Sequence, residues 1–208
     1  LHDLQNTGDF ITADLLDQKI LVCRNKEGKL KAYFNVCMHR GHILAEGKGN
    51  RSIFTCPFHA WSYDLQGDLK AAGNAENVAG FGLEDFHLSE IRVDTLGMLV
   101  FVNLDTDAPP LAEWAPGLLE DWRTKVKFFD DVRLTHSRAY DIAANWKLSF
   151  DQNECYHCAS VHPGFSTITD VPDEWVTTEN QYWLTHLMRS TEIVRQSRLS
   201  DAKQRHLS

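Results

Sequence analysis

Two short motifs that pair a cysteine with a histidine constrain this sequence more than any other feature. Cys37 and His39 form a Cys-x-His motif. Cys56 and His59 form a Cys-x-x-His motif, with sixteen residues between the two. Two thiolates and two neutral imidazoles can hold a tetrahedral zinc ion, or can divide between the two irons of a [2Fe–2S] cluster. Each motif supplies one ligand of each kind, which favours the cluster, since zinc knuckles more often pair like residues as Cys-x-x-Cys.

The residues around these ligands also suit a cluster. Gly41 and Pro57 allow the backbone to wrap closely around sulfide ions, and three further side chains can cover the cluster: Arg40, His42 and Trp61. The alternatives are a structural zinc site or unrelated buried residues.

Short strands separated by turns surround the two motifs. Apolar patterns predict strands at residues 20–23, 30–36, 52–55, 61–65, 91–93 and 97–104. Residues 25–28 and 66–68 have the composition of tight turns. Each motif thus lies at the tip of a strand–loop–strand element, and we expect an all-β unit that ends near Asn103.

A boundary is predicted at residues 105–110, because two prolines with small and acidic residues disfavour both helix and strand pairing. Beyond it, apolar residues at helical intervals predict a helix over residues 111–125. Residues 134–142 suggest a strand, and residues 145–162 suit a helix. We therefore predict an α+β chain with two domains. They cover residues 1–105 and 106–208.

A second group of metal-binding residue types lies in the predicted second domain. On a helix, Glu154 and His157 are three residues apart and share a face, and His162 lies five residues further on. Two imidazoles and a carboxylate with open coordination positions are the ligand set of non-haem Fe(II) oxygenases. Cys155 and Cys158 leave three alternatives open: a zinc site with the two histidines, a redox dithiol, and an ordinary helix with buried histidines.

Both groups together resemble the Rieske oxygenase family. The N-terminal match rests on residues 37–42 (CMHRGH) and 56–61 (CPFHAW), and the catalytic match rests on residues 145–147 (NWK) and 154–163. The resemblance implies that an all-β Rieske [2Fe–2S] domain, at residues 1–105, precedes the first part of an α+β catalytic domain.

The resemblance also assigns roles to individual residues. The ligands of the [2Fe–2S] cluster would be Cys37, His39, Cys56 and His59. A mononuclear Fe(II) would be bound by His157 and His162. Glu154 would be a bridging carboxylate, hydrogen-bonded to His157 and to a Rieske histidine, which couples the two sites and orients a ligand imidazole.

The family's third iron ligand is an aspartate far downstream in the catalytic domain. The late aspartates of this chain, none of which we assign to that role, are Asp170, Asp173 and Asp201. We therefore expect the chain to be an incomplete part of a longer oxygenase subunit, without a complete mononuclear site.

The surroundings of the iron ligands resemble the branch of the family that acts on quaternary ammonium compounds, including the carnitine monooxygenase oxygenase component and betaine demethylases. One mark of this branch is Glu154, since ring-hydroxylating members usually carry aspartate at that position. The resemblance extends to residues 35–37 together with 40–42, to residues 74–79 and to residues 162–166. It implies O2-dependent hydroxylation of a carbon next to nitrogen in a carnitine, glycine betaine or proline betaine type of substrate. C–N cleavage or N-demethylation would follow.

The same resemblance implies partners. Electrons would come from NAD(P)H through a separate flavin/iron–sulfur reductase, and a head-to-tail homotrimer would let each cluster serve the neighbour's iron. Aromatic faces recognise a trimethylammonium group, so we consider a cage of Trp175, Tyr182 and Trp183. The alternative role of these three side chains is core packing.

Two other functions remain open. An oxygenase for an aromatic ring or aromatic ether would have Trp and Phe in a pocket without an acidic partner. A Rieske electron-transfer protein would carry two irons per chain, where an oxygenase would carry three.

Charge and hydropathy exclude some partners. The 29 acidic residues outnumber the 21 basic ones, for a formal net charge of −8. A negative surface repels phosphate backbones and anionic lipid, so nucleic acid and membrane are not expected as partners. The longest uncharged apolar run, at residues 97–104, is far short of a bilayer span, and no signal peptide is recognised at the start. We expect a soluble, cytoplasmic protein.

Overall fold

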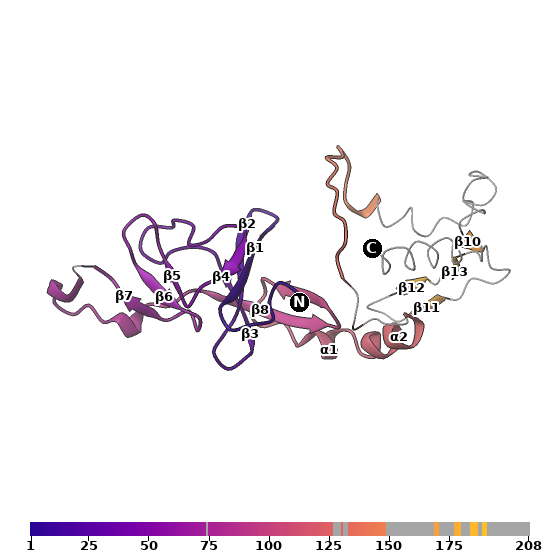
Figure 1. The fold of residues 1–208 in the computed structure, drawn as a ribbon, viewed down its shortest axis with the longest axis horizontal. Helices are drawn as coiled ribbons and strands as arrows, with labels where there is room; N and C mark the ends of the chain where they lie inside the picture. Colours follow the sequence, from indigo (N-terminus) through magenta and orange to yellow (C-terminus); the bar gives the residue numbers. More distant parts are fainter. Residues whose placement is uncertain are drawn as a thin grey trace, which may run out of the picture. The chain divides into compact units, whose positions relative to one another are not determined.

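The computed structural model describes residues 1–73, 75–126, 130 and 133–148, together with the backbone of four short strands further along the chain (Figure 1). The chain divides into two compact units, Leu1–Leu134 and Thr135–Ser208. The domain boundary predicted at residue 105 stays a prediction. Residues 106–134, beyond that boundary, belong to the first unit, and within it the Leu111 N–H donates to Asp94 Oδ2 at 2.9 Å.

A six-stranded antiparallel sheet forms the larger part of the first unit, with strand order β4-β1-β2-β3-β8-β9. Its strands are β1 (Asp9–Leu15), β2 (Gln18–Arg24), β3 (Leu30–Phe34), β4 (Lys48–Asn50), β8 (Glu90–Leu96) and β9 (Leu99–Asn103). Four consecutive apolar residues of the inner strand β2 are buried. Because side chains alternate between the faces of a strand, Leu21 and Cys23 enter one core while Ile20 and Val22 enter another.

A three-stranded antiparallel sheet carries the second Cys/His motif. It consists of β5 (Ile53–Thr55), β6 (Ser62–Asp64) and β7 (Leu69–Ala71). As predicted, the motif lies between β5 and β6, and the turn at residues 66–68 joins β6 to β7. Gly67 in this turn has a φ of 89°, and a Cβ there would lie 2.7 Å from the Tyr33 ring. The turn therefore needs glycine to pack against β3.

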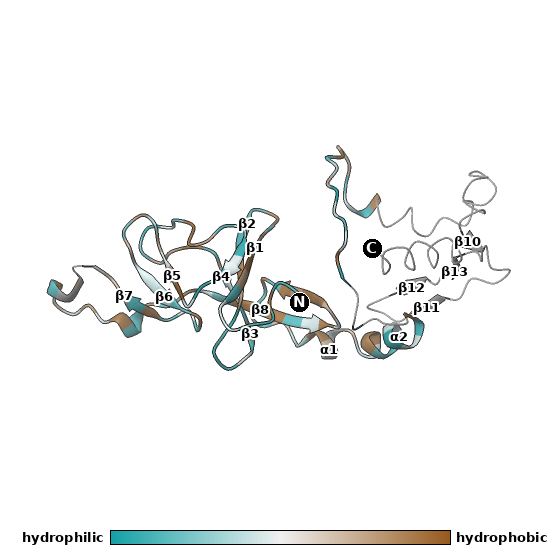
Figure 2. Cartoon of the chain, viewed as in Figure 1, coloured by the Kyte–Doolittle hydropathy of each residue, from teal (hydrophilic) through white to brown (hydrophobic). Residues whose placement is uncertain are grey.

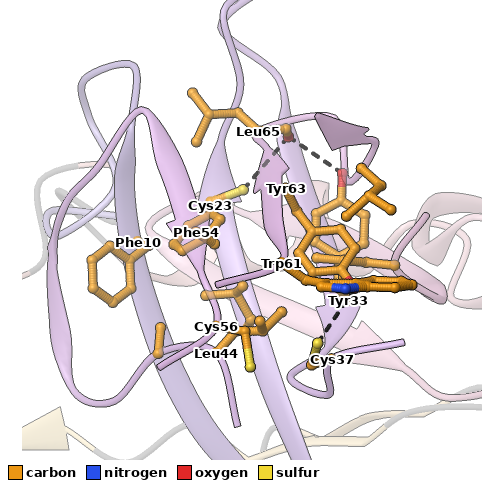
Figure 3. Close-up of a cluster of buried hydrophobic side chains, with 14 of the residues drawn as sticks. Phe10, Cys23, Tyr33, Cys37, Leu44, Phe54, Cys56, Trp61, Tyr63 and Leu65 are labelled. Atoms are coloured by element: carbon orange, nitrogen blue, oxygen red, sulfur yellow. Dashed lines mark hydrogen bonds between the residues drawn. The ribbon is translucent and has the colours of Figure 1, made fainter. Parts of the chain in front are cut away.

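The two sheets share one hydrophobic core, which contains both motif cysteines (Figure 3). Its buried members are Phe10, Leu21, Cys23, Tyr33, Cys37, Leu44, Ala45, Phe54, Cys56, Trp61, Tyr63, Leu65, Leu69, Ala72 and Leu88. Phe10 of β1 and Phe54 of β5 meet edge to face, with ring centroids 5.4 Å apart. This pair ties the small sheet to the large one beneath the metal-binding motifs.

Short helices and strands complete the described chain. They are η1 (Ala75–Asn77), η2 (Leu83–Asp85), α1 (Leu111–Trp114), α2 (Leu118–Lys125), β10 (Thr169–Asp170), β11 (Thr177–Glu179), β12 (Leu184–His186) and β13 (Arg189–Ser190). Within the described ranges, no helix has the length and apolar character needed to cross a bilayer. Figure 2 shows hydrophobic and hydrophilic residues intermixed along the strands of the first unit.

The structure confirms the all-β N-terminal part and corrects several details. In the first unit, strands β1, β4 and β7 were not predicted. The helix expected over residues 111–125 is divided into α1 and α2, because Pro116 has no N–H to donate and Gly117 adopts a φ of 82°. The strand suggested at residues 134–142 is not formed, and the side chains there are exposed, since an apolar pattern supplies no partner strand. Most of the helix expected at residues 145–162 lies outside the described residues.

Candidate metal centre

The first motif lies on a tight loop that runs from Cys37 to His42. The Cys37 N–H donates to the carbonyl of His42 at 2.8 Å, and the Gly41 N–H donates to the carbonyl of Cys37 at 2.9 Å. Gly41 has a φ of 73°, in the left-handed region that glycine adopts without steric cost. These two hydrogen bonds close a six-residue loop.

The second motif lies on a loop of the same construction, from Cys56 to Trp61. The Cys56 N–H donates to the Trp61 carbonyl at 2.8 Å, and the Ala60 N–H donates to the Cys56 carbonyl at 2.9 Å. Ala60 occupies the position that corresponds to Gly41 and has a φ of 58°. An L-residue pays a steric cost in this conformation, so the second loop is held in shape by its surroundings.

The two loops present thiols inward and imidazoles outward. Cys37 and Cys56 are 2% and 3% exposed, and Figure 3 shows their sulfur atoms at the same border of the core. His39 and His59 are exposed, with ring centroids 4.8 Å apart. This donor set fits a [2Fe–2S] cluster with thiolates on an inner iron and imidazoles on an outer one. Among the described residues, no three His, Cys, Asp or Glu side chains form a group suited to a single metal ion.

Tyr63 lies directly behind the first loop. Its hydroxyl oxygen accepts the Met38 N–H at 3.0 Å and lies 3.5 Å from Cys37 Sγ. Since the oxygen already accepts from the backbone, its own O–H is available to donate to the sulfur. Burial, followed by the hydrogen bond with Cys37, raises the pKa of Tyr63 above its ordinary value, so this donor stays protonated at neutral pH.

Asn35 holds the chain just after the first loop. Its Nδ2 donates to the Ala45 carbonyl at 2.7 Å, and its Oδ1 accepts the N–H groups of Leu44 and Ala45 at 3.1 and 3.2 Å. The side chain is 2% exposed, so it satisfies backbone groups that water does not reach. No role was assigned to Asn35 in the sequence analysis; a polar residue at the end of an apolar strand was the available signal.

The three residues expected to cover the cluster differ in their exposure to solvent. Trp61 is buried, and its indole lies against the ring of His39. Arg40 and His42 are exposed at the tip of the first loop. Cys23, the third described cysteine, is not part of the centre: burial raises the pKa of its thiol to about 12, and its Sγ contacts the Leu65 carbonyl at 3.8 Å.

The second predicted group lies outside the described residues. This applies to the expected iron ligands His157 and His162, to Glu154, and to the cage candidates Trp175, Tyr182 and Trp183. Their roles, like the ligand roles of the four Rieske-type residues, stay predictions.

Family comparisons agree with the arrangement along the chain. Residues 1–82 match the Rieske [2Fe-2S] domain, and residues 129–206 match the catalytic domain of the ring hydroxylating alpha subunit. The first match contains both loops described above, and the second contains Glu154, His157 and His162.

The similar proteins include oxygenase subunits of monooxygenases for carnitine and for glycine betaine. The chain is 34% identical to the carnitine monooxygenase oxygenase subunit of Acinetobacter baumannii, over 91% of this chain and 52% of that protein. It is 34% identical to the glycine betaine monooxygenase oxygenase subunit of Pseudomonas aeruginosa, over 75% of this chain and 36% of that protein. The chain thus spans about half the length, or less, of these relatives.

Similar solved structures also include a quaternary ammonium Rieske monooxygenase. The quaternary ammonium Rieske monooxygenase CntA in complex with L-carnitine superposes with a TM-score of 0.81 at 33% identity, over 90% of this chain and 53% of that one. Naphthalene 1,2-dioxygenase with indole bound superposes less well, with a TM-score of 0.55 at 26% identity, over 60% of this chain and 29% of that one. The predicted fold class, an all-β domain followed by the start of an α+β catalytic domain, is confirmed.

Proposed function

This chain belongs to the Rieske non-haem iron oxygenases, and we propose that it is part of an oxygenase component that acts on a quaternary ammonium compound. The identity to carnitine and glycine betaine monooxygenase oxygenase subunits, about one third, supports this substrate class. The family domains imply a [2Fe–2S] cluster and a mononuclear iron.

The pair of matched loops is the observation that carries the proposal. In this proposal, the buried thiols of Cys37 and Cys56 would hold one iron of the cluster, and the exposed imidazoles of His39 and His59 would hold the other. When bound, the cluster supplies single electrons and the mononuclear iron supplies O2 activation. The loops keep the thiols away from water and leave the imidazoles accessible to another protein surface.

The proposed mononuclear site is formed by His157 and His162, with Glu154 beside them. A carboxylate hydrogen-bonded to the free N–H of a ligand imidazole fixes its tautomer and ring orientation. We propose that Glu154 does this for His157 and that it also accepts a hydrogen bond from a Rieske histidine.

The exposed side chains around the cluster loops support a partner surface. Met38 is 44% exposed and Phe58 is 54% exposed, and both lie next to a histidine of the centre. An apolar rim of this kind is stabilised when another protein covers it. We propose that the catalytic domain of a neighbouring subunit covers it within a homotrimer. The solved structure of one quaternary ammonium Rieske monooxygenase is described as revealing inter-subunit electron transfer.

The remaining parts of the proposal concern substrate and electron source. A trimethylammonium substrate fits aromatic faces such as those of Trp175, Tyr182 and Trp183. Hydroxylation of the carbon next to nitrogen gives a carbinolamine, whose C–N bond breaks to release an aldehyde and an amine. Electrons come from NAD(P)H through a flavin/iron–sulfur reductase, so we propose a cytoplasmic location, where NAD(P)H is supplied.

A single-turnover experiment on the full-length protein tests the function. The protein is reduced, separated from reductant and exposed to O2 with carnitine, glycine betaine, proline betaine or an aromatic acid. We expect trimethylamine or formaldehyde in step with reoxidation of the cluster. Product from the aromatic acid alone would instead identify an aromatic ring-hydroxylating or O-demethylating oxygenase.

Iron content separates the other classes. We expect three irons per full-length chain; two would indicate an electron-transfer protein, and a colourless zinc protein would exclude the cluster altogether. Replacing Glu154 with Gln should leave the iron content unchanged and slow product formation.

A further inference from the structure

The two histidines of the centre are held by different neighbours. His39 lies flat against the indole of Trp61, with ring centroids 4.8 Å apart and ring planes 11° apart. Trp61 is 8% exposed, and Phe81 and Phe86 meet its indole edge to face at 5.8 and 5.3 Å. Phe81 and Phe86 are themselves stacked at 5.1 Å and pack against the core. The ring of His39 is therefore the outer member of an aromatic stack that is anchored in the protein interior.

The aromatic neighbour of His59 is more exposed to solvent than that of His39. The ring of Phe58 lies 3.9 Å from that of His59, centroid to centroid, at a tilt of 37°. Phe58 is 54% exposed, and exposed side chains change rotamer on the picosecond to nanosecond timescale. The aromatic side chain beside His59 is thus more than half exposed to solvent, whereas the one beside His39 is packed against the core.

The contact also crosses from one loop to the other. Trp61 is the last residue of the second loop, and the histidine that it covers belongs to the first. The corresponding last residue of the first loop is His42, which is exposed and whose ring lies 5.8 Å from that of Phe58. Two loops with the same backbone closure therefore differ in the side chain that fills the sixth position.

We infer that Trp61 is a positioning residue, which holds the imidazole plane of His39 and leaves the imidazole of His59 to adapt to the surface that covers it. The inference rests on the proposed [2Fe–2S] cluster. A metal-bound histidine ring is held at its ligating nitrogen and at its Cβ, but it can still rock about these two attachments. A flat indole against its face, backed by two phenylalanines, restricts that motion.

The test compares Trp61→Leu with Phe58→Leu in the full-length, cluster-loaded protein. The reduced cluster is paramagnetic, and pulsed EPR resolves the couplings of the two iron-bound imidazole nitrogens and the spread of their orientations. In Trp61→Leu, we expect the spread for one imidazole to increase at least twofold. In Phe58→Leu, we expect that same imidazole to keep its wild-type spread.

An unchanged spectrum in Trp61→Leu would overturn the inference, as would an equal broadening of the same imidazole in Phe58→Leu. If Trp61→Leu does not assemble its cluster, Phe86→Leu decides, because it removes support behind the indole and leaves the His39 contact intact. Broadening of one imidazole there supports the inference, and a wild-type spectrum contradicts it. Wild-type protein without two imidazole couplings would refute the proposed cluster itself, which keeps the two failures apart.

Discussion

The hydroxyl of Tyr63 offers a quantitative test of the candidate centre. Its oxygen accepts the Met38 N–H at 3.0 Å and lies 3.5 Å from Cys37 Sγ, so its proton is available to the sulfur. A hydrogen bond to a ligand sulfur stabilises the reduced, more negative state of an iron–sulfur cluster and so raises its reduction potential. Tyr63→Phe removes this donor and keeps the ring.

We expect Tyr63→Phe to lower the reduction potential by about 20–60 mV. A hydrogen bond contributes roughly 0.5–1.5 kcal/mol net. For a one-electron couple, about 1.4 kcal/mol corresponds to about 59 mV. The same substitution removes the acceptor of the partly buried Met38 N–H, so the free energy of unfolding should also fall by about 0.5–1.5 kcal/mol.

Redox titration followed by EPR measures the potential, and Tyr33→Phe is the matched control. Tyr33 is equally buried, but its hydroxyl donates to the Leu65 carbonyl at 3.3 Å and reaches neither ligand cysteine. Its potential should match that of the wild type. An unchanged potential in Tyr63→Phe, or the same decrease in both variants, would refute the role of the hydroxyl.

Three further predictions concern the loops and the core. Ala60→Gly should raise the free energy of unfolding by about 0.5–1 kcal/mol and Gly41→Ala should lower it by about 1 kcal/mol, because both residues have a left-handed backbone. A Cβ at Gly41 would meet no atom within 4 Å, so this backbone cost is the only one expected there. Denaturant titrations in which both variants change in the same direction would contradict this. Asn35→Ala should cost about 3 kcal/mol and release iron, since it leaves two buried N–H groups unpaired. Its control, Asn25→Ala, also loses three hydrogen bonds but should keep its iron; equal iron content in the two variants would count against a role for Asn35 in holding the loop. Burial raises the pKa of Cys23 to about 12, so the stability that its neutral thiol contributes is complete below the unfolded-state pKa of about 8.5 and is lost as pH rises toward the folded-state value. Cys23→Ala should therefore show a shallower decrease in unfolding free energy above about pH 9 than the wild type, and parallel curves would show that the thiol is not responsible.

Local sequence predicted the parts of the fold that depend on local rules. The turn at residues 66–68 and the buried strand at Ile20 to Cys23 follow from turn composition and from a run of apolar residues. Strand β4 was missed because its three residues, Lys48 to Asn50, carry no apolar pattern and form a strand only through pairing with β1. The division of the helix at Pro116 could have been predicted from the residue itself, since proline lacks the N–H that a helix interior requires.

The candidate centre also combines features that local sequence predicted with features that depend on tertiary packing. The sequence by itself determined which residue types are available, at which spacing, and that two loops must present them, because the Cys/His motifs and the strand-forming runs around them are local. Only the tertiary structure decided that the two loops share one backbone closure, that the thiols are buried while the imidazoles are exposed, and that Tyr63 and Trp61 of the second motif's strand–loop–strand element contact Cys37 and His39 of the first. These contacts join residues more than twenty positions apart, and only the packing of two sheets over one core brings them together.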